Sequence, residues 1–142
     1  MARVVRRTFT LRNSLQELDT LREHLEAFAS ECGLTPRSLF ELNLILDELL
    51  TNVITYGFPG GGDHVILMDL GLDDDTMHVV MADDGEPFDP RQAPEPEMDG
   101  PLESRSIGGL GIHLVKSLVQ EIDYQRAGGR NVLKLTKRMQ RT

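Results

Sequence analysis

The segment that most constrains the fold runs from Thr35 to Gly57, because it predicts one long helix with defined ends. Thr35 is a favoured N-cap residue, and Pro36 takes the first helical position, where proline has no hydrogen bond to lose. Gly57 is the expected end. The apolar side chains recur at helical spacing and form one broad stripe that must face a core: Leu39, Leu42, Leu46, Leu49, Leu50 and Val53.

The polar side chains of this helix fall on two separate faces. One face is plainly polar and carries Asn43, Asp47 and Thr51. The other is a narrow polar stripe with apolar neighbours on both sides, and its members are Glu41, Glu48, Asn52 and Thr55, bordered by Ile45 and Tyr56 and by Phe40 and Leu44. Apolar borders indicate a helix that lines a polar pocket. The alternative is that Glu48 and Asn52 form an ordinary surface pair four residues apart.

Two more helices and five strands are predicted around this helix. Ser14 and Glu17 have the spacing of a capping box for a helix that Gly33 ends. A third helix follows the glycines at 108–111 and carries apolar residues at Ile112, Val115, Leu118, Val119 and Ile122. Strands are expected at residues 3–11, 64–70, 77–82, 122–126 and 132–136. This order favours an α+β, two-layer sandwich in a single domain (1–142), with helices packed on one face of a mainly antiparallel sheet.

Asp83 and Gly85 directly follow a predicted strand. A carboxylate at a strand end can accept a hydrogen bond from an exocyclic amine, and a glycine lets the backbone approach a flat ring. The alternative is an ordinary acidic turn.

The run from Gly108 to Gly111 precedes the third helix. Free N–H groups at a helix start, with no Cβ to block approach, suit a phosphate. The alternative is a flexible loop exit, and no Lys-Ser/Thr pair follows to make a P-loop. Between these two motifs, residues 86–107 hold five of the 7 prolines, which is typical of a functional or disordered loop.

Composition excludes several classes of protein. The net charge of −8 argues against a general nucleic-acid binder. No apolar run approaches the roughly 20 residues of a membrane helix. The single Cys32 cannot form an internal disulfide, so we expect a reducing, cytoplasmic location. The 4 histidines lack metal-ligand spacing, which makes a zinc site improbable.

In combination and order, the three motifs resemble the GHKL superfamily of ATP-binding domains, which share the Bergerat fold. The similarity spans residues 5–138 and is greatest to the anti-sigma factor serine/threonine kinase branch. The resemblance implies Mg-ATP as the ligand, with Glu48 as general base and Asn52 holding Mg²⁺. It implies that Asp83 accepts a hydrogen bond from the adenine amine and that Gly85 packs under the adenine ring. It also implies that residues 86–107 form an ATP lid. The phosphates would be bound by Gly109, Leu110, Gly111 and, at the γ-phosphate, Arg105.

The resemblance also implies partners. The protein would phosphorylate a STAS-domain anti-anti-sigma protein on Ser or Thr, sequester a sigma factor and form a homodimer. The alternatives are a binding module that uses ATP without phosphotransfer, a detached histidine kinase catalytic domain, and the same fold with an inactive nucleotide site. Three departures stand out. Pro87 replaces the second glycine of the D-x-G-x-G motif, the interval from Arg105 to Gly109 does not clearly match the kinase branch, and Gly129-Arg130-Asn131 stands where a Gly-Thr box is expected.

Overall fold

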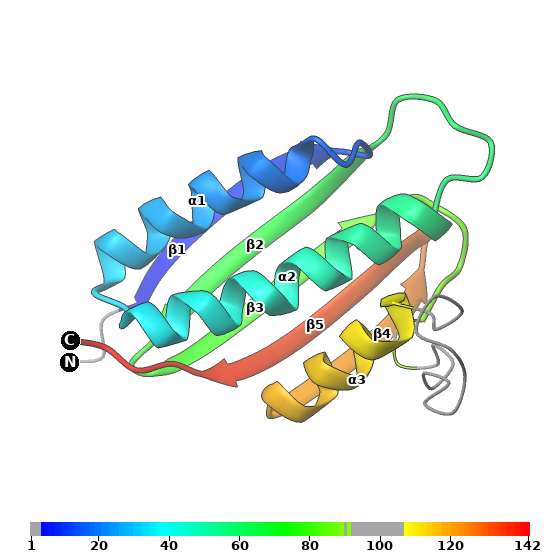
Figure 1. Ribbon diagram of the computed structural model, residues 1–142. Coiled ribbons are helices and arrows are strands. Elements are labelled where there is room, and N and C mark those ends of the chain that lie inside the picture. Colours follow the sequence, from blue (N-terminus) through cyan, green and yellow to red (C-terminus); the bar gives the residue numbers. More distant parts are fainter. Residues whose placement is uncertain (1–3, 90, 92–106) are drawn as a thin grey trace.

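A computed structural model describes residues 4–89, 91 and 107–142, with side chains described from 111 onward in the last range. In this part of the chain, three helices lie on one face of a five-stranded sheet (Figure 1). The helices are α1 (Glu17–Cys32), α2 (Pro36–Tyr56) and α3 (Ile107–Leu118). The strands are β1 (Val4–Arg12), β2 (Val65–Asp73), β3 (Thr76–Asp83), β4 (Glu121–Ala127) and β5 (Arg130–Arg138). The predicted α+β sandwich is confirmed, and all four strand pairings are antiparallel.

The strand order is β1-β2-β3-β5-β4, so the last strand lies inside the sheet. Its residues pair with β3 along the whole length, from Thr76 opposite Arg138 to Asp83 opposite Asn131. On its other side β5 pairs with β4 through a tight hairpin whose two glycines, Gly128 and Gly129, have positive φ of 60° and 76°. The D-x-G segment (Asp83 to Gly85) therefore follows the end of β3 and also lies beside the start of β5.

The core lies between the sheet and α2. Alternate residues of β2 are buried, and so is the predicted apolar stripe of α2, apart from the half-buried Leu39. Ile45 was expected at the border of the polar stripe but is fully buried, because the sheet covers a wider arc of the helix than the stripe alone indicates. Burial of such side chains is the main stabilising contribution to a fold of this kind. Among the described helices, none is both long and apolar enough to span a bilayer.

The ends of the first two helices follow the predictions only in part. Gly33 ends α1 in the left-handed conformation (φ 72°), and Thr35 caps α2 by accepting a hydrogen bond from Ser38 N on Oγ1 at 3.2 Å. The prediction of a capping box at Ser14 is wrong. The Glu17 carboxylate accepts from Arg12 N at 2.8 Å, and Ser14 contributes only its carbonyl oxygen, to Glu17 N. The backbone N–H of Arg12, at the end of the preceding strand, thus bonds to the Glu17 carboxylate in place of the N–H at the helix start that a capping box would use.

The third helix begins earlier than its apolar spacing predicts. It starts at Ile107, so the glycines at 108–111 lie within its first turns rather than before them. Packing against α2 overrides the low helix propensity of glycine here. Ile122, predicted in this helix as well as in a strand, lies only in β4.

The face of α2 expected to be plainly polar is not fully solvated. Buried oxygen atoms of Asn43 and Asp47 have no hydrogen-bond partner within the described residues. Burial raises the pKa of Asp47, and the charge of Arg22 on α1 partly opposes this. The neighbouring helix α1 packs along α2, which periodicity within α2 alone cannot show.

An ion pair joins α2 to β5. Lys137 Nζ lies 2.7 Å from Glu41 Oε2, with side chains only 7% and 21% exposed, and it also donates to Leu118 O at 3.1 Å. Hydrogen bonding to Lys137 lowers the pKa of Glu41. One member of the predicted polar stripe therefore has a structural partner and is not available to line a ligand site.

We expect Glu41→Gln to lower the free energy of unfolding by roughly 2–3 kcal/mol, because the Lys137 ammonium then stays buried without its counter-charge. The double variant Glu41→Leu with Lys137→Met should be close to neutral, since it removes both charges. Urea unfolding of the three proteins measures this. A single variant as stable as the original would contradict the role of the pair.

Candidate functional site

The three sequence motifs meet around the C-terminal half of α2. Glu86 N donates to Gly57 O at 2.7 Å, which joins the D-x-G segment to the end of this helix. On the other side, Gly111 of α3 lies directly against the Glu48 carboxylate. The helix, the strand end and the glycine run are thus brought together, although they are far apart in the sequence.

Gly85 is required by a close backbone approach. A Cβ at this position would lie 2.5 Å from Gly57 O and 2.9 Å from Asp83 Oδ1. Real Cβ atoms do not approach backbone oxygens so closely, so any other residue would push the turn away from α2. The sequence prediction gave Gly85 a role under a ring, and the structure adds this second reason for glycine.

Asp83 is the last residue of β3 and is 3% exposed. Its Oδ1 accepts two hydrogen bonds, from Gly85 N at 2.8 Å and from Asn131 Nδ2 at 2.9 Å. No described residue donates to Oδ2. The carboxylate is thus held at one oxygen and has the other available for a ligand, as an acceptor for an exocyclic amine requires.

Glu48 and Asn52 lie one turn apart on α2 and both have an unsatisfied buried atom. Glu48 Oε1 and Asn52 Nδ2 have no hydrogen-bond partner among the described residues, and Asn52 is 4% exposed. Burial raises the pKa of Glu48; the nearby Asn52 side chain lowers it, although its amide does not meet hydrogen-bond geometry with the carboxylate, and the charge of Asp47 raises it further. Unpaired buried polar groups are costly and uncommon. Four lie on this helix, and Glu48 and Asn52 are the two on the narrow polar stripe, where a polar ligand could pair with them.

Two predicted groups lie wholly or partly beyond what the structure describes. Arg105 and most of the proposed lid at 86–107 lie outside the described residues, and Gly109 and Leu110 are placed only as part of α3. The beginning of the lid is described. Phe88 packs on Tyr56 with ring centroids 5.6 Å apart, and Arg91 forms a 2.8 Å ion pair with Asp89.

The sequence prediction assigned no role to the β4–β5 hairpin. Arg126 Nη1 donates to Gly85 O at 2.6 Å, and Asn131 donates to both Asp83 and Glu86. The only sequence signal for the hairpin was that Gly129-Arg130-Asn131 replaces a Gly-Thr box. This signal points to the site only once the strand order is known, because the order places β5 beside β3.

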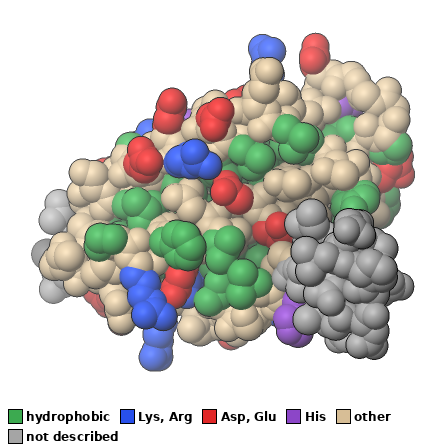
Figure 2. Space-filling model, in the orientation of Figure 1, with side chains coloured by type: hydrophobic (Ala, Val, Ile, Leu, Met, Phe, Trp, Pro, Cys, Tyr) green, Lys and Arg blue, Asp and Glu red, His purple; other side chains and the backbone are tan. Residues whose placement is uncertain are grey.

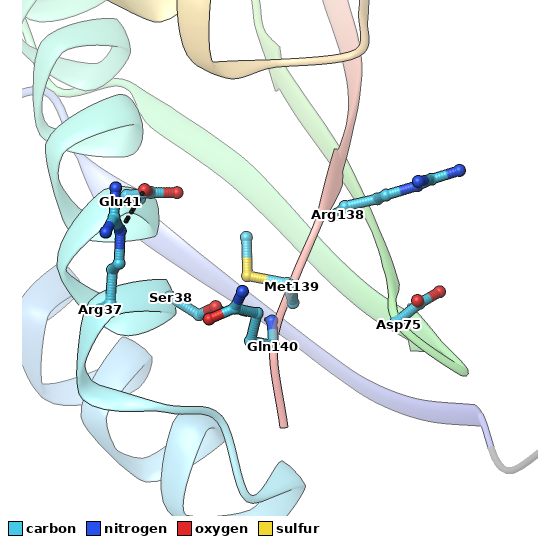
Figure 3. A pocket seen from close by; sticks show the side chains of 7 residues that line it. All are labelled: Arg37, Ser38, Glu41, Asp75, Arg138, Met139 and Gln140. Carbon is cyan, nitrogen blue, oxygen red and sulfur yellow. Dashed lines mark hydrogen bonds and ion pairs between the residues drawn. The ribbon is translucent and has the colours of Figure 1, made fainter. Parts of the chain in front are cut away.

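A separate hollow lies at the other end of the molecule. It has a volume of about 560 Å³ and lies between the N-terminal turn of α2 and the far ends of β3 and β5 (Figure 3). Arg37 is bonded to Glu41, whereas Arg138 and Asp75 point away from α2. The hollow contains none of the predicted site residues, and its charged groups do not converge on one point.

Among the described residues, the helical face carries no continuous basic patch. On the face that Figure 2 shows, the basic side chains of these residues are scattered among acidic and apolar ones. Within those residues, no cluster of three or more His, Cys, Asp or Glu side chains could hold a metal ion. A bound Mg²⁺ would therefore need phosphate oxygens or water as well as Asn52, which is how this ion is usually held beside nucleotides.

Comparison with known families agrees with this fold. Residues 11–137 match the histidine kinase-like ATPase domain, and the chain belongs to this family. It is similar to the serine/threonine-protein kinase BtrW of Bordetella bronchiseptica, with 32% identity over 112 residues that cover 79% of each chain. It is also similar to the serine-protein kinase RsbW of Bacillus subtilis, with 27% identity over 115 residues, or 77% of this chain and 71% of the relative.

Solved structures show the same fold. A structure of the RsbU and RsbW domains of Rv1364c from Mycobacterium tuberculosis has a TM-score of 0.67 at 17% identity, covering 97% of this chain and 33% of that one. A blue-light activated histidine kinase of Erythrobacter litoralis has a TM-score of 0.55 at 17% identity, covering 85% of this chain and 41% of the other. This chain thus spans less than half of either solved chain, and the likeness concerns the fold alone.

Because Gly111 abuts Glu48, Gly111→Ala tests this contact. In an ordinary helix interior the change would stabilise by about 1 kcal/mol, since alanine has the higher helix propensity. Here the new methyl would overlap the Glu48 carboxylate, which is the end of a flexible side chain and would have to rotate away. The gain in stability should therefore be smaller than about 1 kcal/mol, and should return to about that value when Glu48→Ala is present as well. Chemical denaturation of the single and double variants measures this, and a full gain in the single variant would contradict this packing.

Proposed function

We propose that this protein is a Mg-ATP-dependent protein serine/threonine kinase. The observation that carries the proposal is that Glu48 Oε1 and Asn52 Nδ2, two of the four unsatisfied buried atoms of α2, share its narrow polar stripe. The turn after Asp83, a carboxylate with one oxygen available, contacts the end of the same helix. These groups suit a phosphate-bearing ligand with an amine at its other end. Similarity to two proteins named as serine kinases favours phosphotransfer to a hydroxyl over other ATP chemistry.

The roles follow from the chemistry of each group. Asp83 accepts the adenine amine, and the glycine-rich start of α3 offers backbone N–H groups to the phosphates. Asn52 holds Mg²⁺, which when bound neutralises charge on the phosphate oxygens. Glu48 accepts the proton of the attacking hydroxyl, and burial in a partly dry site strengthens it as a base.

The remaining elements of the proposal lie wholly or mostly outside the described residues. Arg105 stabilises charge on the γ-phosphate, and residues 86–107 form a lid that closes over the nucleotide. The protein substrate is a STAS-domain anti-anti-sigma protein phosphorylated on Ser or Thr. Binding of a sigma factor in competition with that substrate would make the chain a switch for transcription.

The second candidate is a nucleotide-dependent binding module without phosphotransfer. One observation favours it: the contact of Gly111 with the Glu48 carboxylate places α3 where a substrate hydroxyl would approach. If this contact persists with nucleotide bound, the base stays covered and ATP serves only to order the site.

Glu48→Gln separates the two candidates. It keeps the shape of the side chain and removes its charge, so Mg-ATP binding should persist. Transfer to a STAS-domain serine should fall about 10²–10⁴-fold, as expected for a lost general base. Phosphate incorporated into a co-encoded STAS protein is measured with both enzymes side by side. Tight binding without any transfer by the unmutated protein would leave only the binding module.

The same measurement against pH tests the environment of Glu48. Burial raises the pKa of this carboxyl above its ordinary value of 4.5, so the base becomes protonated, and transfer should fall, at a higher pH than for an exposed glutamate. Since the charge of Asp47 also raises this pKa, Asp47→Asn should move the acidic limb of the profile to lower pH. An unmoved limb would show that the two carboxyl groups are not coupled.

The metal is tested at Asn52. We expect Asn52→Ala to remove most of the gain in ATP affinity that Mg²⁺ provides, while metal-free binding changes less. Calorimetric titration with Mg²⁺ and with a chelator gives both values. Thr51→Ala, a change on the other polar face of the same helix, is the matched control. A full magnesium response in the Asn52 variant would remove this residue from the metal site.

A further inference from the structure

We propose that Asn131 is a positioning residue for adenine recognition, held in place by Tyr124. This inference rests on the proposed binding of ATP and goes beyond it, because it assigns the orientation of the Asp83 carboxylate to the β4–β5 hairpin. Sequence reasoning gave neither residue a role.

The amide of Asn131 is fully used. It is 5% exposed, and its Nδ2 donates to Asp83 Oδ1 at 2.9 Å and to Glu86 O at 2.9 Å, with a longer 3.4 Å contact to Gly85 O. Its Oδ1 accepts a hydrogen bond from the Tyr124 hydroxyl. Both donors and the carbonyl oxygen of the amide therefore have partners within the protein.

This arrangement permits only one orientation of the amide. A flipped Asn131 would place its oxygen against the Asp83 carboxylate and the Glu86 carbonyl, so acceptors would face acceptors. The Tyr124 hydroxyl reinforces the observed orientation by donating to the amide oxygen. Tyr124 thus acts on Asp83 only through Asn131, since it makes no hydrogen bond to the carboxylate itself.

The backbone fixes these contacts. Asp83 and Asn131 are register partners on β3 and β5, and Arg126 of β4 pairs with Asn131 in turn. Arg126 also donates to Gly85 O at 2.6 Å, so the hairpin holds the D-x-G turn at its carboxylate and at its backbone. The turn is therefore hydrogen-bonded to the sheet on one side and, on the other, to Gly57, the residue that follows α2.

The consequence concerns ligand selectivity. With Oδ1 saturated by Gly85 N and Asn131 Nδ2, Oδ2 is the oxygen that meets the purine. Adenine offers an amine there, whereas guanine offers a carbonyl that a fixed carboxylate repels. A carboxylate free to rotate could turn away from guanine or meet adenine poorly, so the ratio of ATP to GTP affinity depends on how firmly Asp83 is held.

The test measures Mg-ATP and Mg-GTP affinities of Tyr124→Phe, Asn131→Leu and the double variant by calorimetry, with thermal unfolding alongside. Lys134→Gln, an exposed change on β5, is the control. We expect Asn131→Leu to weaken ATP about tenfold and GTP about twofold or less, as loss of one buried hydrogen bond to a charged group predicts. Tyr124→Phe should weaken ATP about threefold. The double variant should match Asn131→Leu, because Tyr124 acts through the residue already removed.

The outcomes are distinguishable. The proposal would be supported by a fall in the ratio of ATP affinity to GTP affinity, together with affinity losses in the two single variants that do not add up in the double variant. Losses of ATP and GTP in equal proportion would mean that the hairpin only stabilises the fold, and additive changes would give Tyr124 a separate role. If Asn131→Leu does not fold, the ratio in Tyr124→Phe decides. If the unmutated protein binds neither nucleotide, the proposed function itself fails and the inference with it.

Discussion

The pairing of β5 with β3 is the constraint on which both ends of the molecule depend. At one end of β5, Asn131 lies opposite Asp83 and hydrogen-bonds to it. Toward the other end, Lys137 forms the ion pair with Glu41 that fixes α2 across the sheet. Slipping this register by one residue would turn both side chains to the opposite face of the sheet, and would break both contacts. The position of Asn131 relative to Asp83 is therefore fixed by this register.

Local signals predicted most of the elements, and tertiary contacts explain the errors. The bounds of α2 follow from Thr35, Pro36 and Gly57, because capping and proline chemistry act within a few residues. The sequence could not show that α1 lies against Asp47, nor that α3 extends back through its glycines to Ile107. Both depend on which helix packs beside α2, and a pattern within one element carries no information on its neighbours.

The candidate site shows the same division. The placement of Glu48 and Asn52 on a separate stripe was visible in the helical period, and so was the position of Asp83 at a strand end. The Asn131 partner of Asp83 was not visible, because it comes from a strand 48 positions later that enters the middle of the sheet. A hairpin at the end of the chain predicts an edge more readily than an interior position, so Asn131 could not be assigned to this site before the strand order was known.

Polar groups without protein partners and a polar group held by several protein donors coexist within this one site. Glu48 and Asn52 have buried atoms that no described residue pairs with, so a polar ligand could satisfy them. Asp83 is instead held at one oxygen by fixed donors, so little ordering would remain to be done when a base binds. The division would suit a nucleotide, because its base could be recognised by a rigid acceptor in the sheet, whereas its phosphates could meet groups at the interface between two helices. Unpaired groups would then lie at the phosphate end of the ligand and fixed groups at the base end.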